Sequence, residues 1–422
     1  MLDPKFIREH AKDVKKACAN KRMDIDVDAW LKLDAERLTL LKNAEAIRGK
    51  RNAVAEQMKS ASNADRPGLI DQGKKLKDDL TGAEASLSEA DAEWMRILMS
   101  IPNVLHPDAP VGAGDEENVE VRTVGKVGKL KGPLDHVALA EKHDLIDFPR
   151  AAKVSGAKFY YLKGKLALLE QALVRFALDY LVREGFIPMS TPDLAKDNVI
   201  VGTGFSPRGP ETQMYSVENS DISLIGTSEI TLGGYHMDEM LAPASLPLKY
   251  AGISHCFRTE AGSYGRESYG LYRVHQFTKV EMFVFCTPEQ AEALHIELLR
   301  HEENIFKALE IPYRVVDICS GDLGGPAYRK YDLEAWMWGR NEGKGGWGEV
   351  TSASNCTDYQ ARRLSIRTKN ADGENVFAYT LNGTAISLAR ALIVILENHQ
   401  QADGSIKIPD ALVPYCGFDR IG

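Results

Sequence analysis

Apolar side chains recur at alternating spacings of three and four residues along two stretches between residues 28 and 100. The first stretch places Leu33, Leu40, Ala44, Ile47, Val54 and Met58 at these spacings, and the second Leu76, Leu80, Ala83, Leu87, Ala90, Trp94 and Ile97. Such spacing predicts heptad helices. The segment SASNADRPG, residues 60–68, interrupts the pattern with turn-forming residues. We therefore expect an antiparallel coiled-coil arm, about 33 residues long on each side and roughly 50 Å in length.

The hydrophobic pattern changes after residue 100. Three prolines and several glycines predict a linker over residues 101–125. Helical periodicity over 164–184, 287–309 and 384–399 then alternates with short strand-like runs. These runs are ISLIG, LKYAGISHCFRTE, HQFTKVEMFVFC, YRVVDIC, YDLEAWM and FAYTLNG. Their number and spacing predict an antiparallel sheet, so we expect an α+β fold.

The length of 422 residues suggests two or three domains. The N-terminal segment is charged from its start, and no apolar run reaches the ~18 residues of a membrane helix. The six cysteines form no CxxC pair, so we expect buried thiols and no zinc. These features predict a cytoplasmic protein without a membrane partner. The chain also lacks a Walker loop and a GxGxxG motif after a strand.

Basic residues gather on the distal part of the predicted arm. The formal net charge of −8 would by itself disfavour a nucleic-acid partner. Residues 42–77 nevertheless hold nine basic and four acidic side chains, and 9 − 4 gives +5. The candidates for phosphate contact include Lys42, Arg48, Lys50, Arg51, Lys74, Lys75 and Lys77. A solvated coiled-coil face rich in Lys and Glu is the alternative interpretation.

The segment FRTEAGSYGRESYGLYRVHQFTKVE, residues 257–281, is dense in groups suited to a nucleotide. Arg258 and Glu260 alternate, which predicts that both face one side of a strand. A glycine-rich loop precedes a second strand, on which Phe277, Lys279 and Glu281 alternate in the same way. A guanidinium can hold phosphate and a ring can stack on a base. A surface hairpin with cross-strand ion pairs is the alternative.

Two further clusters carry candidate chemistry. In GEVTSASNC, residues 348–356, Glu349 and Ser352 could hold a magnesium ion that carries ATP phosphates. In LNGTAISLARALIVILENHQ, residues 381–400, a strand is expected to end at Asn-Gly, and a helix follows. Arg390 lies in the first turns of that apolar helix, where an unpaired charge would be unfavourable. The arginine is therefore functional or tightly paired.

Taken together, these clusters resemble the class II aminoacyl-tRNA synthetases. FRTE with its loop looks like motif 2 of that class, the Arg390 helix like motif 3, and FIPMSTPDL with Pro192 like motif 1. The match narrows to the seryl-tRNA synthetase family through FPRAAKVSGAKFYYLKG, GTSE, RVHQFTKVE, YDLEAW, NCTDYQARR and LENHQ. The arm matches the same family, so the resemblance covers nearly the whole chain.

The resemblance implies a catalytic domain over residues 111–422, with a six- or seven-stranded antiparallel sheet flanked by helices. It implies an N-terminal tRNA-binding domain over residues 1–110, whose arm spans about 28–100. The expected activity is formation of seryl-adenylate from L-serine and ATP with Mg²⁺, followed by transfer to serine tRNA. Whether selenocysteine tRNA is also charged stays open. A homodimer with motif 1 at its interface is implied as well.

The resemblance also assigns site residues. Arg258 and Arg390 would be catalytic, holding the α- and γ-phosphates. The residues implied for ATP are Arg258, Thr259, Glu260, Val274, Phe277, Glu349, Val350, Thr351, Ser352 and Arg390, with Glu349 and Ser352 holding Mg²⁺. The residues implied for serine are Thr227, Ser228, Glu229, Glu281 and Thr384. Glu281 and Thr384 would distinguish serine from alanine by bonding its hydroxyl.

Three departures from the family pattern stand out. Tyr269 lies in the motif 2 loop where many relatives carry arginine, and Thr384 replaces a serine but keeps the hydroxyl. The stretch WGRNEGKGGWG, residues 338–348, is longer and richer in glycine than usual, and we interpret it as a mobile hairpin tip. A serine-activating paralogue that loads a carrier protein and a non-catalytic relative are the rival readings. The first typically lacks the arm, and the second should have lost the arginines and serine ligands.

Overall fold

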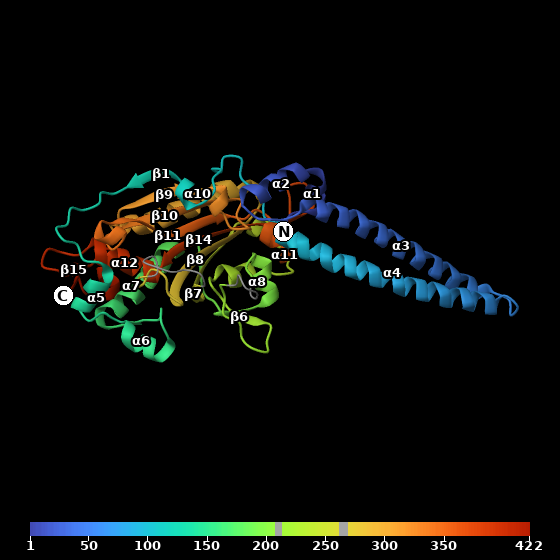
Figure 1. Cartoon of the computed structure of the whole chain (residues 1–422), viewed down its shortest axis with the longest axis horizontal. Helices are drawn as coiled ribbons and strands as arrows, with labels where there is room; N and C mark the ends of the chain where they lie inside the picture. Colours follow the sequence, from blue (N-terminus) through green and yellow to red (C-terminus); the bar gives the residue numbers. More distant parts are fainter. Residues whose placement is uncertain (207–212, 261–268) are drawn as a thin grey trace. The chain divides into compact units, whose positions relative to one another are not determined.

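The computed structural model describes residues 1–206, 213–260 and 269–422. The chain divides into two compact units, Met1–Val104 and Leu105–Gly422. Part of the glycine-rich loop expected after Glu260 lies outside the described residues. Figure 1 shows a pair of long helices in the first unit and a large sheet with helices around it in the second.

The first unit is helical. Its helices are α1 (Pro4–Glu9), α2 (Ala11–Asn20), α3 (Val27–Ser60) and α4 (Arg66–Ser100). Helices α3 and α4 pack together as an antiparallel hairpin (Figure 1), which confirms the predicted arm. Every predicted seam position is buried or partly buried. The turn is shorter than expected, because Pro67 lies in the first turn of α4, where its missing N–H is not needed.

The base of the arm is stabilised by a stacked pair of tryptophans and by hydrogen bonds to a buried aspartate. The rings of Trp30 and Trp94 stack at 5.8 Å. Asp34, which is 2% exposed, accepts hydrogen bonds from Trp94 Nε1 at 2.8 Å and from Arg8 Nη1 at 2.8 Å. Towards the tip the buried residues are reduced to Ala44, Val54 and Leu80, as expected for a two-helix seam.

The second unit is built on an eight-stranded sheet with the order β1-β9-β10-β11-β14-β8-β7-β4. Its strands are β1 (Val119–Val124), β4 (Ile187–Ser190), β7 (Leu248–Phe257), β8 (Gln276–Cys286), β9 (Tyr313–Asp317), β10 (Arg329–Met337), β11 (Gly346–Asn355) and β14 (Tyr379–Ser387). All neighbouring strands are antiparallel except β4 and β7, which are parallel. The mostly antiparallel α+β fold is therefore confirmed, with more strands than expected.

Helices and small two-stranded sheets complete this unit. The helices are α5 (His136–Lys142), α6 (Phe148–Ser155), α7 (Gly164–Arg183), α8 (Asp197–Thr203), α9 (Glu229–Gly233), α10 (Pro288–Ala308), α11 (Tyr359–Arg363), α12 (Leu388–Asn398) and α13 (Val413–Cys416). The small sheets pair β2 (Ile146–Asp147) with β3 (Tyr161–Leu162), β5 (Leu194–Lys196) with β6 (Ile222–Leu224), β12 (Arg367–Lys369) with β13 (Asn375–Phe377), and β15 (Ile406–Lys407) with β16 (Arg420–Ile421). The main core lies where α7, α10 and α12 pack on the central strands.

Three sequence predictions about elements were wrong. Residues 101–125 are not only a linker, because β1 lies within them and pairs with β9. The strand FAYTLNG does not end at Asn-Gly, since β14 continues to Ser387 and α12 begins four residues later than expected. Residues 346–348 belong to β11, so the hairpin tip between β10 and β11 is shorter than the interval 338–348.

Candidate functional site

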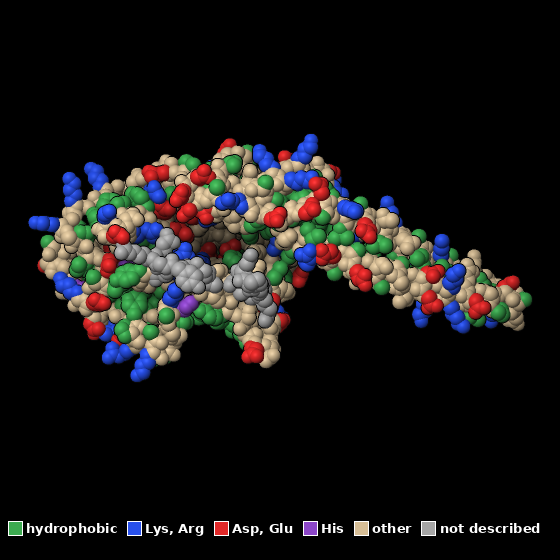
Figure 2. Space-filling model, in the orientation of Figure 1, with side chains coloured by type: hydrophobic (Ala, Val, Ile, Leu, Met, Phe, Trp, Pro, Cys, Tyr) green, Lys and Arg blue, Asp and Glu red, His purple; other side chains and the backbone are tan. Residues whose placement is uncertain are grey.

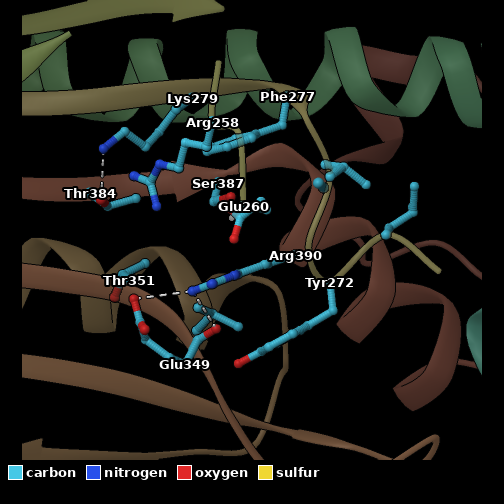
Figure 3. Close-up of a pocket in the computed structure, with 14 residues that line it drawn as sticks. Arg258, Glu260, Tyr272, Phe277, Lys279, Glu349, Thr351, Thr384, Ser387 and Arg390 are labelled. Carbon is cyan, nitrogen blue, oxygen red and sulfur yellow. Dashed lines mark hydrogen bonds and ion pairs between the residues drawn. The ribbon is translucent and has the colours of Figure 1, made fainter. Parts of the chain in front are cut away.

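A cavity opens over the face of the sheet formed by β8, β14 and β11 (Figure 3). Its lining consists of Arg258, Glu260, Leu271, Tyr272, Val274, Phe277, Lys279, Glu349, Val350, Thr351, Thr384, Ser387, Ala389 and Arg390. Alternation brings Phe277 and Lys279 to this face, as the sequence predicted for β8. The structure thus gathers side chains from three separate sequence clusters around one cavity.

Arg258 and Glu260 reach the cavity from a loop, so the prediction that both stand on a strand was wrong. Strand β7 ends at Phe257, and Glu260 has a φ of +47°, in the left-handed region. Arg258 Nε donates to the carbonyl of Gly226 at 3.3 Å, and its guanidinium lies 5.3 Å from the Phe277 ring centre. Glu260 Oε2 accepts from Arg273 Nη1 at 3.1 Å. Each side chain is thereby held at the end of a strand.

Arg390 is paired, as the cost of burying a lone guanidinium requires. It lies in the first turn of α12, and its Nη1 is 3.1 Å from Glu349 Oε1 and 3.0 Å from the Glu349 carbonyl oxygen. Its guanidinium also lies 4.7 Å from the Tyr272 ring centre (Figure 3). Burial alone would raise the pKa of Glu349, but the positive charges of Arg390, Lys330 and Arg258 outweigh burial and lower that pKa.

The cavity that Arg390 and Glu349 help to line is small. The cavity has a volume of about 50 Å³, whereas sites for drug-sized ligands usually have ~300–1,000 Å³. Both members of the pair line this cavity, as Figure 3 shows. A ligand of nucleotide size would need more space than this cavity provides.

A second polar group lies at the β8–β14 pair. Thr384 and Glu281 are register partners on these strands, and Thr384 Oγ1 donates to Glu281 Oε2 at 3.2 Å. Lys279 Nζ forms a close ion pair with Glu281 and lies 3.4 Å from Thr384 Oγ1. All three side chains are less than one-tenth exposed. A hydroxyl, a carboxylate and an ammonium therefore lie together in a largely buried position.

Thr227 and Ser228 directly precede α9, which begins at Glu229, and none of the three is among the residues that line the cavity. Thr227 Oγ1 accepts from the Glu229 backbone N–H at 3.2 Å, and Ser228 Oγ donates to the Gly252 carbonyl at 3.3 Å. Burial, followed by the negative charge of Glu281, raises the pKa of Glu229 to about 7. Thr259, Ser352 and Glu281 likewise lie outside the residues that line the cavity.

Several lining residues were not among the sequence-derived candidates. Lys279 was noticed on its strand but given no role, although it is charged, buried and faces the cavity. Nothing in the sequence marked Tyr272 as a site residue beyond its position after the loop. The structure shows that its ring packs against the Arg390 guanidinium. Tyr269 and the tip of the β10–β11 hairpin line a different cavity, together with His136 and Glu397.

The seven arm candidates are all exposed. They lie on α3 and α4, in the sequence region where basic residues outnumber acidic ones, and Arg48 Nη2 is paired with Glu84 at 2.8 Å. Figure 2 shows basic side chains projecting from the distal part of the arm, with acidic ones between them. The arrangement suits a charged, extended partner better than an apolar one.

Within the described ranges, no group of three or more His, Cys, Asp or Glu side chains could hold a metal ion. The helices placed there are all too short or too polar to cross a bilayer. The six cysteines have free thiols, and five of them are buried.

Comparison with known proteins gives matches over the whole chain. The family model for the tRNA synthetase class II core domain (G, H, P, S and T) matches residues 214–399, and the model for the seryl-tRNA synthetase N-terminal domain matches residues 1–105. The serine–tRNA ligase of Treponema denticola is 55% identical over 424 residues, covering 100% of both chains. That of Rubrobacter xylanophilus is 53% identical, covering 100% of this chain and 99% of the relative.

Comparison with solved structures gives matches to the same family. The crystal structure of seryl-tRNA synthetase from Pyrococcus horikoshii complexed with ATP matches with a TM-score of 0.91 and 40% identity, covering 100% of this chain and 99% of that one. The cytoplasmic serine–tRNA ligase from Naegleria fowleri in complex with AMP matches with a TM-score of 0.87 and 29% identity, covering 100% and 98%.

The antiparallel sheet, the arginine after β7 and the arginine of α12 together define a class II aminoacyl-tRNA synthetase core. The N-terminal arm and the full-length identities then narrow the class. The chain belongs to the seryl-tRNA synthetase family.

Proposed function

We propose that this chain activates L-serine with ATP, giving seryl-adenylate and pyrophosphate, and then transfers serine to the 3′ end of serine tRNA. One observation carries the proposal. Arg258, Arg390 and Thr384 line a single cavity, and Thr384 is bonded to Glu281 beside it. Two phosphate-binding cations thus lie next to a hydroxyl and a carboxylate suited to a small polar amino acid.

In the first step, a carboxylate oxygen of serine attacks the α-phosphorus of ATP, and the bond to the bridging oxygen of pyrophosphate breaks. No protein nucleophile is needed, because positioning and charge stabilisation are sufficient. Arg258 holds the α-phosphate and Arg390 the γ-phosphate, while the Phe277 ring stacks on adenine near Val274 and Glu260. The remaining predicted ATP contacts come from Thr259, Val350 and Thr351. In the second step, a ribose hydroxyl of the tRNA attacks the acyl carbon and AMP leaves.

Binding of the γ-phosphate by Arg390 would change the partner of its guanidinium. Its ion pair with Glu349 lies in the small cavity, so a phosphate oxygen would replace Glu349 as the partner of the guanidinium. The freed Glu349 carboxylate and the Ser352 hydroxyl are oxygen donors of the kind that Mg²⁺ prefers. When bound there with ATP, Mg²⁺ would neutralise phosphate charge. The substrate itself thus completes the metal site.

Serine is held by Thr227, Ser228, Glu229, Glu281 and Thr384. The carboxylates of Glu229 and Glu281 suit the substrate ammonium, and the Thr384–Glu281 pair suits its hydroxyl. A buried polar pair that loses its substrate partner rejects the analogue lacking the hydroxyl strongly. Alanine is therefore excluded by unpaired polar groups rather than by size.

The exposed basic residues of the arm contact the tRNA backbone, and residues 1–110 act as the tRNA-binding domain beside a catalytic domain over 111–422.

The chain works as a cytoplasmic homodimer, for which motif 1 supplies the interface. In support, β4 is an edge strand whose Ile187 is 52% exposed, and Leu168 of α7 is 55% exposed. Each arm serves the tRNA bound at the partner active site, because an arm of roughly 50 Å can reach past its own site.

The decisive test is ATP- and Mg²⁺-dependent attachment of labelled serine to a total tRNA pool, with alanine and threonine alongside. Serine labelling that an Arg258→Ala variant lacks would support the proposal. Serine-dependent ATP–pyrophosphate exchange without tRNA labelling would favour a carrier-loading paralogue, and no exchange would favour a non-catalytic relative. Mixed dimers of an armless subunit and an Arg258→Ala subunit should charge tRNA if the arm crosses, and their inactivity would contradict crossing.

A further inference from the structure

A buried glutamine lies behind the proposed serine ligands. Gln360 of α11 is 0% exposed and makes three hydrogen bonds. Its Nε2 donates to the carbonyl oxygen of Thr203 at 3.0 Å and to Glu229 Oε1 at 2.8 Å. Its Oε1 accepts from Thr380 Oγ1 at 2.7 Å. The partners come from α8, α9 and β14, so the amide links three elements of the fold.

These partners fix which way the amide points. The Thr203 carbonyl can only accept, and an ionised Glu229 can only accept, so both require the –NH₂ group of Gln360. Thr380 Oγ1 has a proton to give and satisfies the opposite end. A flipped amide would set its oxygen against two other oxygens. Gln360 therefore presents a donor to Glu229 in one orientation.

A second amide reaches the same carboxylate oxygen. Asn382 Nδ2 donates to Glu229 Oε1 at 2.8 Å. Glu229 Oε1 thus receives two N–H bonds, while among the described residues no protein donor reaches Oε2. Bonds from uncharged amides stabilise the ionised form without adding a positive charge that would repel an ammonium group. The free oxygen stays available to a ligand.

We infer that Gln360 is a positioning residue for serine recognition, holding the Glu229 carboxylate so that its second oxygen faces the substrate ammonium. This inference rests on the proposed function and deepens it. Gln360 itself touches no substrate. Its effect should therefore appear in serine binding and not in ATP binding.

The charges around Glu229 explain why its ionised form needs the hydrogen bond from Gln360. Glu281 of β8 opposes its ionisation, whereas Lys279 of β8 and Arg258 after β7 favour it. Burial and Glu281 dominate and raise the pKa of Glu229 to about 7, and the bond from Gln360 lowers that pKa. Removing the bond should raise the pKa further, so that more of the carboxyl is protonated near neutral pH.

The test is the Gln360→Met variant, which keeps the length of the side chain and removes its donors. Serine-dependent ATP–pyrophosphate exchange should show a KM for serine raised roughly 10- to 100-fold, as expected for a lost bond to a charged group. The KM for ATP should stay within about twofold. The loss in kcat/KM for serine should be larger at about pH 6 than at about pH 8.5, because higher pH restores the ionised carboxyl.

Gln400→Met is the matched control. Gln400 is also a buried glutamine with three hydrogen bonds, to the carbonyl and N–H of Leu134 and the carbonyl of Glu397, but it lies away from Glu229. Its loss should lower the melting temperature without a serine-specific change in KM. If Gln360→Met fails to fold, Thr380→Val provides a milder perturbation, which removes the hydroxyl that orients the amide and should raise the serine KM severalfold.

Different results of these experiments would contradict the role of Gln360 and the proposed function. An unchanged serine KM in folded Gln360→Met or Thr380→Val would overturn the inference, as would equal rises for serine and ATP. A loss that does not depend on pH would mean that Gln360 acts only as structural support. Failure of the proposed function would look different, because the unmodified chain would then show no serine-dependent exchange at all.

Discussion

Replacing Thr384 by valine should remove much of the discrimination between serine and alanine. Valine has nearly the same shape and volume as threonine, and it lacks the hydroxyl. Thr384 Oγ1 lies 3.2 Å from Glu281 Oε2. Without this donor the Glu281 carboxylate is no longer held for the substrate hydroxyl, and the hydrogen bond between that hydroxyl and a charged group contributes ~1.5–3 kcal/mol. This corresponds to a fall of roughly 10- to 150-fold in kcat/KM for serine.

Alanine cannot use this hydroxyl, so its own weak activation should change by less than about threefold. Amino-acid-dependent ATP–pyrophosphate exchange, measured with each amino acid in turn, gives both values. Thr384→Ser keeps the hydroxyl and should retain most of the activity with serine. If Thr384→Val preserved the serine-to-alanine ratio, Thr384 would not read the substrate hydroxyl.

Three other predictions concern separate parts of the molecule. Arg390→Gln should lower exchange by about 100-fold or more, since it removes a phosphate partner that substrate assembly requires; activity near the unmodified level would contradict the role. Changing Lys74, Lys75 and Lys77 to Glu should raise the KM for tRNA and flatten its salt dependence while leaving ATP–pyrophosphate exchange unchanged. The same change at three exposed lysines outside the arm, at positions 126, 129 and 153, should leave the KM for tRNA unchanged. The kcat/KM for serine should fall as pH drops through about 7, because protonated Glu229 cannot hold an ammonium group; a flat profile down to about pH 5.5 would refute this.

The two long helices of the arm were predictable because their periodic signals are long. Two seams of six and seven apolar positions define α3 and α4, and only the turn was misjudged. Strand β11 was missed since it opens with Gly-Trp-Gly, which is typical of a loop. Strand β1 is almost wholly exposed at the edge of the sheet, so it lacks the alternation that marks a half-buried strand.

Many side chains that line the cavity were named from residue type and motif resemblance, but their pairing was not predicted. Motif resemblance pointed to Arg390 and Glu349, and nothing in the sequence indicated that they pair with each other across the cavity. The same holds for Gln360, which is one polar residue among several in the string NCTDYQARR. Hydrogen-bond partners come from elements far apart in the chain, and periodicity carries no information about which side chains meet.

The length of the arm formed by α3 and α4 can change independently of the sheet and its cavity. Its seam repeats every seven residues, so deleting one heptad from each helix would keep every remaining contact in register. Each such step shortens the arm by about 10 Å. The sheet and its cavity contribute nothing to that repeat. Selection could therefore fit the length of the arm to the dimensions of the proposed tRNA partner without disturbing the residues that line the cavity.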